Sequence, residues 1–265
     1  MRKIGINMGA IGGLSEVDYV KLISELGFNC TFTGVKKTVA DQVASAELFA
    51  KHGIEYETLH APFGHINDIW LDCEGGDMML SELTTSVDHC KAAGVGILVV
   101  HLSSGLTPPS ITDIGRARFA KLMEHAEKCG VIIAYENQRM LGNIAWAFEE
   151  FASSEYIGFC WDCGHEHCFT NGRQYMPLFG KKLVCTHIHD NSGRFNDDSH
   201  YIPFDGSFDY QRFARQINEA EYTGSLMLEV IAGNGKGFYD GVAPEVYLQK
   251  AADAVKKLRT MVDGN

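Results

Sequence analysis

The sequence predicts a single (β/α)8 TIM barrel, one domain spanning residues 1–265, and three observations predict it. Eight short runs rich in Ile, Val and aromatic residues have the length of buried strands. Segments with apolar residues at helical spacing separate these runs, and about 250 residues is the usual length of such a barrel. The strand-like runs cover 3–8, 28–35, 54–60, 96–102, 131–136, 157–162, 183–188 and 225–231. A doubly wound open sheet is the main alternative, because alternation alone does not show closure.

The first predicted helix shows the pattern that later segments repeat. In "SEVDYVKLISELG", Ser15 is placed to cap the start of the helix. Val17, Val20 and Ile23 line one face of it. Gly27 follows the last turn, where glycine supplies the positive φ that leads the chain toward the next strand.

The composition argues against several classes of partner. The net charge is −11 at pH 7, and an acidic surface repels polyanions, because nucleic-acid affinity comes largely from Lys and Arg on phosphates. The longest apolar runs are far shorter than a membrane span, and the first residues lack the apolar segment of a signal peptide. We therefore expect a cytoplasmic protein with no nucleic-acid or membrane partner and with its eight cysteines reduced. Whether it forms a homo-oligomer is left open.

The ends of six consecutive predicted strands carry an imidazole or a carboxylate. In chain order these residues are His60, His101, Glu136, Asp162, the pair His187 and His189, and Glu229. In a barrel the carboxyl ends of the strands converge on one mouth. A charged group in an apolar run is costly to bury unless it is paired or bound to a cation. A ring of such residues therefore predicts a divalent metal site.

The segment "WDCGHEHCF" (161–169) concentrates the residue types that bind metals. A structural zinc knot would need a second Cys/His pair at matching spacing, which the sequence lacks. A redox pair of Cys160 and Cys163 would normally open a helix, and Cys160 is better interpreted as a small core residue. We therefore interpret Asp162 and His165, spaced i, i+3, as one corner of the larger metal site.

Seven motifs, in this order, resemble those of the xylose-isomerase-like TIM-barrel superfamily. They are "LHAPF", "VVHLSSG", "YEN", "WDCGH", "HIHDN", "DDSHYIPFDGSFDY" and "LMLEV". That group includes sugar and sugar-phosphate isomerases and epimerases, and the DNA-repair enzyme endonuclease IV. The resemblance covers nearly the whole chain, and it is specific for the superfamily but not for a substrate.

The resemblance implies a metal site built from strands five to eight. Its core ligands fall on Glu136, Asp162, His187 and Glu229. His187 is preferred on the seventh strand because the family pattern His-x-x-Asp begins there, and His189 is the competing register. Members with a trinuclear zinc cluster use further ligands, which leaves the number of ions open. The matching positions in this sequence are His60, His101, His165, His189, Asp198 and His200.

The resemblance also implies residues that touch the substrate. In one-metal epimerases these are the histidine of the Asp-x-x-His motif and an arginine after strand seven. Here they correspond to His165 and Arg194, and Arg194 departs from the epimerase spacing by one position. The loop "GNGKGF" (233–238) follows the eighth strand, where barrels often bind phosphate. With Lys236 it would hold a sugar phosphate, and a flexible glycine loop is the simpler alternative.

The predicted function is a divalent-metal-dependent isomerase or epimerase acting on a small-molecule sugar or sugar phosphate. Glu136 and Glu229 are the expected catalytic carboxylates, which move a proton through a cis-enediolate. Mixed nitrogen and oxygen ligands favour Zn²⁺ or Mn²⁺, with Co²⁺ or Mg²⁺ as alternatives. Two other functions compete: a trinuclear-zinc phosphodiesterase of the endonuclease IV type, and a non-catalytic metal- or sugar-binding barrel.

Overall fold

A computed structural model of the chain describes residues 1–233 and 237–264. Within these residues eight strands alternate with helices, and each strand lies inside one of the predicted runs. The strands follow the order β7-β6-β5-β4-β3-β2-β1-β8, which confirms the predicted (β/α)8 TIM-barrel class. Their bounds are β1 Ile4–Asn7, β2 Cys30–Gly34, β3 Glu55–His60, β4 Ile97–His101, β5 Ile132–Glu136, β6 Ile157–Asp162, β7 Leu183–His187 and β8 Leu226–Leu228.

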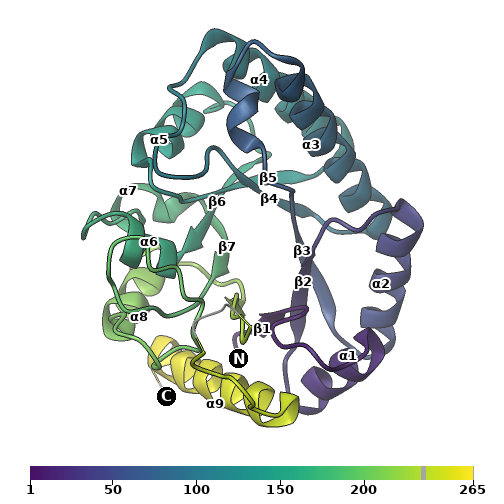
Figure 1. Ribbon diagram of the computed structural model, residues 1–265, viewed down its shortest axis with the longest axis vertical. Coiled ribbons are helices and arrows are strands. Elements are labelled where there is room, and N and C mark those ends of the chain that lie inside the picture. Colours follow the sequence, from purple (N-terminus) through teal and green to yellow (C-terminus); the bar gives the residue numbers. More distant parts are fainter. Residues whose placement is uncertain (234–236, 265) are drawn as a thin grey trace. The chain divides into compact units, whose positions relative to one another are not determined.

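Helices connect the strands (Figure 1). The α-helices are α1 Glu16–Glu25, α2 Val39–Lys51, α3 Glu74–Ala93, α4 Asp113–Cys129, α5 Leu141–Glu150, α6 Cys163–Phe169, α7 Met176–Phe179, α8 Tyr210–Glu219 and α9 Pro244–Asp263. Two 3-10 helices, η1 Ile66–Trp70 and η2 Gly180–Lys182, complete the set. None of the helices in the described ranges is both long and apolar enough to cross a bilayer.

Two compact units make up the chain. The first unit comprises Met1–Phe32, Glu47–Tyr56 and Trp161–Asn265, and in it β1 pairs in parallel with β2 and with β8. Ile188, directly after β7, bridges Leu228 of β8, so the carboxyl ends of these two strands are neighbours. Helix α9 packs on β1 and β8 and lies beside α8 (Figure 1). Strand residues such as Ile6 are fully buried, as expected for parallel strands that are covered on both faces.

The second unit comprises Thr33–Ala46 and Glu57–Cys160. Its strands β3, β4, β5 and β6 pair in parallel in that order. The register places His101, the last residue of β4, directly opposite Glu136, the last residue of β5. Helices α3 and α4 lie side by side on the outside of these strands (Figure 1). Polar residues from adjacent strand ends are thus brought together by pairing alone.

Helix α1 follows the predicted pattern with one difference. The Ser15 side chain accepts a hydrogen bond from the backbone N–H of Asp18, and Gly27 has a φ of 85°. Val20 and Ile23 are fully buried, but Val17 is 52% exposed, so its predicted place on the buried face is wrong. The core contact is made instead by Tyr19, which is buried and donates its hydroxyl hydrogen to the carbonyl oxygen of Asn7.

Candidate functional site

In the second unit, a single carboxylate oxygen contacts two imidazoles. Oε2 of Glu136 lies 3.1 Å from Nε2 of His60 and 3.2 Å from Nε2 of His101. All three side chains are buried, and each ends its strand. Their donor atoms lie within 4.8 Å of one another, the spacing of a potential metal site. We call these three residues the Glu136 cluster.

The tautomer of His60 indicates why this cluster suits a cation. Nδ1 of His60 lies 2.8 Å from the carbonyl oxygen of Ala61, and a carbonyl can only accept, so Nδ1 carries the proton. In the neutral ring Nε2 then directs a lone pair at the carboxylate of Glu136. Only a proton or a metal ion between these two atoms makes the approach favourable. A backbone carbonyl that fixes the outer ring nitrogen is also the usual arrangement around a ligating histidine.

Two residues missed by the sequence reasoning lie against His101. The ring of Phe63 stacks on it with centroids 4.4 Å apart, and Phe63 is 46% exposed. Nε2 of Gln138 lies 3.3 Å from Nε2 of His101. Phe63 is the last residue of "LHAPF", and Gln138 directly follows "YEN". Their positions in or beside these motifs are the signal that could have identified them as site residues.

In the first unit, a larger cluster forms around the carboxyl end of β6. Asp162 is fully buried and caps α6, accepting the backbone N–H of His165 at 2.6 Å. Its Oδ1 also lies 3.1 Å from Nε2 of His189, which is fully buried as well. The i, i+3 spacing of Asp162 and His165 therefore brings both side chains to one site, as the sequence predicted.

Asp198 connects the remaining histidines of this cluster. Its carboxylate oxygens lie 3.3 Å from Nε2 of His165, 3.3 Å from Nε2 of His200 and 3.6 Å from Nε2 of His189. The donor atoms of these four residues all lie within 4.8 Å of one another. We call them, together with Asp162, the Asp162 cluster.

Electrostatics in the Asp162 cluster reflect two carboxylates held among imidazoles. Burial raises the pKa of the Asp198 carboxyl, but His165 and then His200 outweigh it and hold this pKa well below its usual value. Burial lowers the pKa of His200, yet Asp198, with smaller contributions from Glu229 and Asp162, raises it to about 9. The site thus strongly favours positive charge between its carboxylates.

The geometry of the Asp162 cluster fits a metal ion in a second respect. Nδ1 of His200 donates its proton to the carbonyl oxygen of Glu229 at 2.8 Å, which directs Nε2 at Asp198. Neither ring nitrogen of the buried His189 has a well-directed hydrogen-bond partner in the part of the chain that the structure describes. Buried polar atoms normally have partners, and a cation with nitrogen and oxygen ligands would supply one.

His187, which ends β7, and His189, two residues later, take different places. Nδ1 of His187 lies 3.3 Å from Oε2 of Glu229, and its ring stacks on Phe32 with centroids 4.6 Å apart. His189 instead joins Asp162, as described above. Both histidines therefore meet a predicted ligand, and the preference for His187 over His189 as the metal ligand of the seventh strand stays a prediction.

The loop between β7 and α8 is held by Asp190. Its carboxylate accepts the backbone N–H groups of Asn191 at 2.8 Å, Phe204 at 3.0 Å and Phe208 at 3.0 Å. Asp190 is fully buried, and a Cβ on Gly206 would lie 2.2 Å from its Oδ1. The aspartate of the His-x-x-Asp motif thus fixes the loop that carries Asp198 and His200.

The other predicted residues have simpler outcomes. Arg194 is exposed on this loop, and Lys236 lies outside the described residues. Cys160 is fully buried, as expected for a small core residue. Burial, with the charge of Asp162 next, raises the pKa of Cys163 well above its usual value, which disfavours the thiolate that a redox pair needs.

A (β/α)8 barrel whose strands end in buried carboxylate–histidine clusters defines the class of this protein. Residues 20–258 match the family model described as "Xylose isomerase-like TIM barrel", and the chain belongs to that family. The resemblance found in the ordered motifs is therefore confirmed.

Solved structures share the fold over nearly the whole chain. D-psicose 3-epimerase from Clostridium cellulolyticum H10 has a TM-score of 0.80 at 14% identity, covering 98% of this chain and 99% of that one. L-ribulose 3-epimerase has a TM-score of 0.77 at 16% identity, covering 100% and 95%. The 3-keto-D-glucoside 4-epimerase of E. coli has a TM-score of 0.75 at 18% identity, covering 98% and 100%. At such identities these structures show the fold alone.

A curated relative is similar over a shorter segment. The uncharacterized protein y4fM of Sinorhizobium fredii (strain NBRC 101917 / NGR234) is 36% identical over 78 residues. The matched segment is 29% of this chain and 24% of that protein. This likeness covers one segment only, and it gives no information about the activity of this chain.

Proposed function

We propose that this chain is a divalent-metal-dependent carbohydrate isomerase or epimerase that binds more than one ion. The observation that carries the proposal is Glu136, a buried carboxylate approached by the Nε2 atoms of two histidines. The names of the structural neighbours support the substrate class, since they include D-psicose, L-ribulose and 3-keto-D-glucoside epimerases.

The proposed ligands follow the family motifs and the two clusters. The core ligands, assigned because their motifs follow the order of the family motifs, are Glu136, Asp162, His187 and Glu229. His60 and His101 would hold an ion with Glu136, and His165, His189, Asp198 and His200 would hold another with Asp162. Zn²⁺ or Mn²⁺ suits these nitrogen and oxygen ligands, with Co²⁺ or Mg²⁺ as alternatives.

The proposed reaction is proton transfer next to a carbonyl group. A bound divalent cation supplies a Lewis acid for the carbonyl of an α-hydroxy ketone. Glu229 and Glu136 act as base and acid, one removing the proton from carbon and the other returning it. Return to the neighbouring carbon through a cis-enediolate gives isomerisation, and return to the opposite face of the same carbon gives epimerisation.

Substrate contacts are proposed for three residues from the family resemblance and from their positions in the sequence. His165 would hydrogen-bond a sugar hydroxyl, and Arg194 and Lys236 would bind a phosphate if the sugar carries one. We expect a small sugar or sugar phosphate as the only partner, besides a further copy of this chain if it forms a homo-oligomer, and we expect the protein in the cytoplasm.

A second candidate is a trinuclear-zinc phosphodiesterase of the endonuclease IV type. The specific observation in its favour is that every extra ligand position belongs to a group that could hold a metal ion. His60 and His101 group with Glu136, and the other group comprises His165, His189, Asp198 and His200. The net charge of −11 opposes a nucleic-acid substrate, because phosphate binding relies on Lys and Arg.

Two assays separate the candidates. The protein is loaded with Zn²⁺ or Mn²⁺, and its metal content is measured. It is then incubated with a panel of ketoses and their phosphates in deuterated water, and with a chromogenic phosphodiester. Deuterium incorporation at the carbon beside the carbonyl supports the isomerase or epimerase. Phosphodiester hydrolysis without such exchange contradicts it, and neither activity despite full metal loading favours the binding module.

A further inference from the structure

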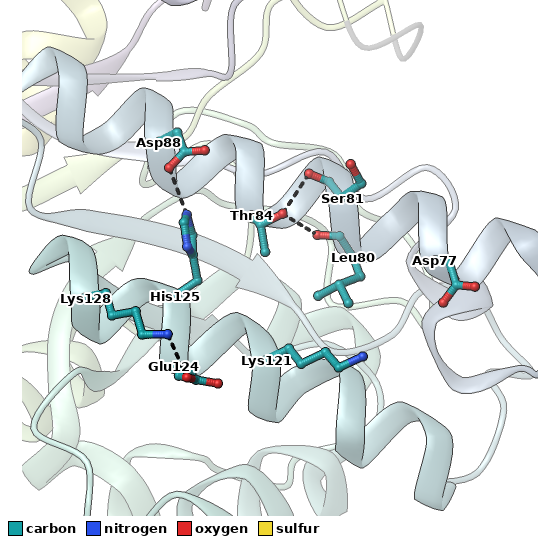
Figure 2. A pocket seen from close by; sticks show the side chains of 9 residues that line it. All are labelled: Asp77, Leu80, Ser81, Thr84, Asp88, Lys121, Glu124, His125 and Lys128. Carbon is teal, nitrogen blue, oxygen red and sulfur yellow. Dashed lines mark hydrogen bonds and ion pairs between the residues drawn. The ribbon is translucent and has the colours of Figure 1, made fainter.

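Another group of side chains that could bind a metal lies between α3 and α4, outside the Glu136 and Asp162 clusters. Figure 2 shows a groove between these two helices, lined by side chains of both. In the view, Asp88 of α3 points across the groove toward His125 of α4. Both helices belong to the second unit, so the arrangement depends on one packed pair of helices.

Three donor atoms of different chemistry converge around His125, which lines this groove. Nε2 of His125 lies 2.8 Å from Oδ1 of Asp88 and 3.9 Å from Sγ of Cys129. All three atoms lie within 4.8 Å of one another. His125 and Cys129 are spaced i, i+4, which places both on one face of α4, one turn apart.

These distances suit tetrahedral coordination. Bonds of about 2.0–2.3 Å to nitrogen, oxygen and sulfur place tetrahedral ligands roughly 3.3–3.8 Å apart. The observed 2.8 Å and 3.9 Å therefore need only small side-chain rotations. Asp88 and His125 are 56% and 34% exposed, so an ion can enter from solvent and the side chains are free to adjust.

We propose that Asp88, His125 and Cys129 bind a borderline-soft divalent ion such as Zn²⁺, with water as the fourth ligand. The thiol of Cys129 releases its proton to solvent on binding, the imidazole binds as the neutral ring, and the carboxylate is already ionised. The two ligand charges then balance the ion. The neighbouring ammonium of Lys128 is paired with Glu124 at 2.7 Å, which reduces its repulsion of the incoming cation.

The site would tie α3 to α4 and is independent of the proposed catalytic function. Any ligand that binds only the folded state stabilises it by mass action. Here the stabilisation would fall on the α3–α4 pair, which carries no residue of the Glu136 or Asp162 clusters. The unfolding free energy of the protein would therefore rise with the zinc concentration, independently of the catalytic reaction.

Co²⁺ substitution tests the proposal, because a thiolate bound to Co²⁺ produces an intense near-ultraviolet charge-transfer band that nitrogen and oxygen ligands do not. The full-length, metal-free protein is titrated with Co²⁺, in parallel with C129S, H125Q and C73S. Cys73 is exposed at the start of α3 and serves as the matched cysteine control. We expect the band in the unmodified protein and in C73S, its loss in C129S, and at least tenfold weaker Co²⁺ binding in H125Q.

Added Zn²⁺ should displace Co²⁺ and so remove the band. It should also slow the alkylation of Cys129 but not of Cys73, as mapped by mass spectrometry. A band that persists in C129S, or no band in the unmodified protein at saturating Co²⁺, overturns the proposal. Equal alkylation of Cys129 with and without Zn²⁺ also contradicts it. Circular dichroism of each variant separates loss of the site from loss of the fold.

Discussion

The ring of His189 occupies the space directly beside Gly164: a Cβ built on Gly164 would lie 2.1 Å from Cε1 of His189. Gly164 is the second residue of α6, between Asp162 and His165. The close approach explains how a residue two positions beyond β7 reaches the carboxylate that ends β6. The absence of a side chain at position 164 is thus a requirement of the Asp162 cluster.

Gly164→Ala should displace His189 and weaken metal binding. The overlap involves a fully buried ring, so we expect a loss of about 1–3 kcal/mol in unfolding free energy, the usual cost of overpacking. Bound metal should fall in the same variant. Gly142→Ala is the matched control, since Gly142 is the second residue of α5 and has open space around it. That variant should be neutral or slightly stabilised, and equal effects at the two positions would contradict the steric explanation.

His187→Ala and His189→Ala should remove different metal ions. His187 contacts Glu229, whereas His189 contacts Asp162 and Asp198. Each variant should bind about one ion fewer per chain by elemental analysis, and the double variant should lose the sum, because effects at independent sites add. If the double variant lost no more than either single one, both histidines would serve the same ion.

Asp190→Ala should loosen the loop that carries Asp198 and His200. The substitution leaves three backbone N–H groups without their charged acceptor, for which we expect a cost of about 3–5 kcal/mol in unfolding free energy. Hydrogen exchange should rise at Phe204 and Phe208. Asp209→Ala, which removes only the cap of α8, should cost about 1 kcal/mol and leave the loop protected.

Glu136→Gln should abolish most turnover while preserving the fold. The amide has nearly the shape of the carboxylate but neither its charge nor its basicity, so we expect kcat to fall by about 10²–10⁴. Steady-state kinetics on the best substrate and thermal unfolding give the two readouts. Glu55→Gln, at an exposed glutamate that pairs with Lys3, is the control and should keep full activity. An active Glu136→Gln enzyme would exclude Glu136 as a catalytic acid or base.

His89 should make the metal-free protein less stable in mild acid. Burial lowers its pKa, although the charge of Asp88 partly opposes this, and its Nδ1 lies 3.2 Å from Oε1 of Gln42. Above the usual value of 6.5 the ring is neutral in both states and contributes no pH dependence. Below it the unfolded chain takes up a proton that the folded one resists, so stability falls with pH. His89→Gln should flatten this part of the stability curve; an unchanged slope would assign the effect to other groups.

The sequence by itself determined the fold class and most of the candidate residues. Every strand falls within its predicted run, because parallel strands that are buried on both faces consist of near-continuous apolar residues. The polar residues at the strand ends stood out against that background. Pairing in register then makes neighbours of residues such as His101 and Glu136, far apart in the chain.

Only the tertiary structure decided how these side chains group. The family pattern favours His187 over His189 as the metal ligand, yet in the structure His187 meets Glu229 and His189 meets Asp162. That division depends on the room left by Gly164 and on the loop that Asp190 holds, neither of which has a local signal. The physical reason is that strand periodicity fixes which residues end a strand, whereas packing between elements fixes the distances on which coordination and catalysis depend.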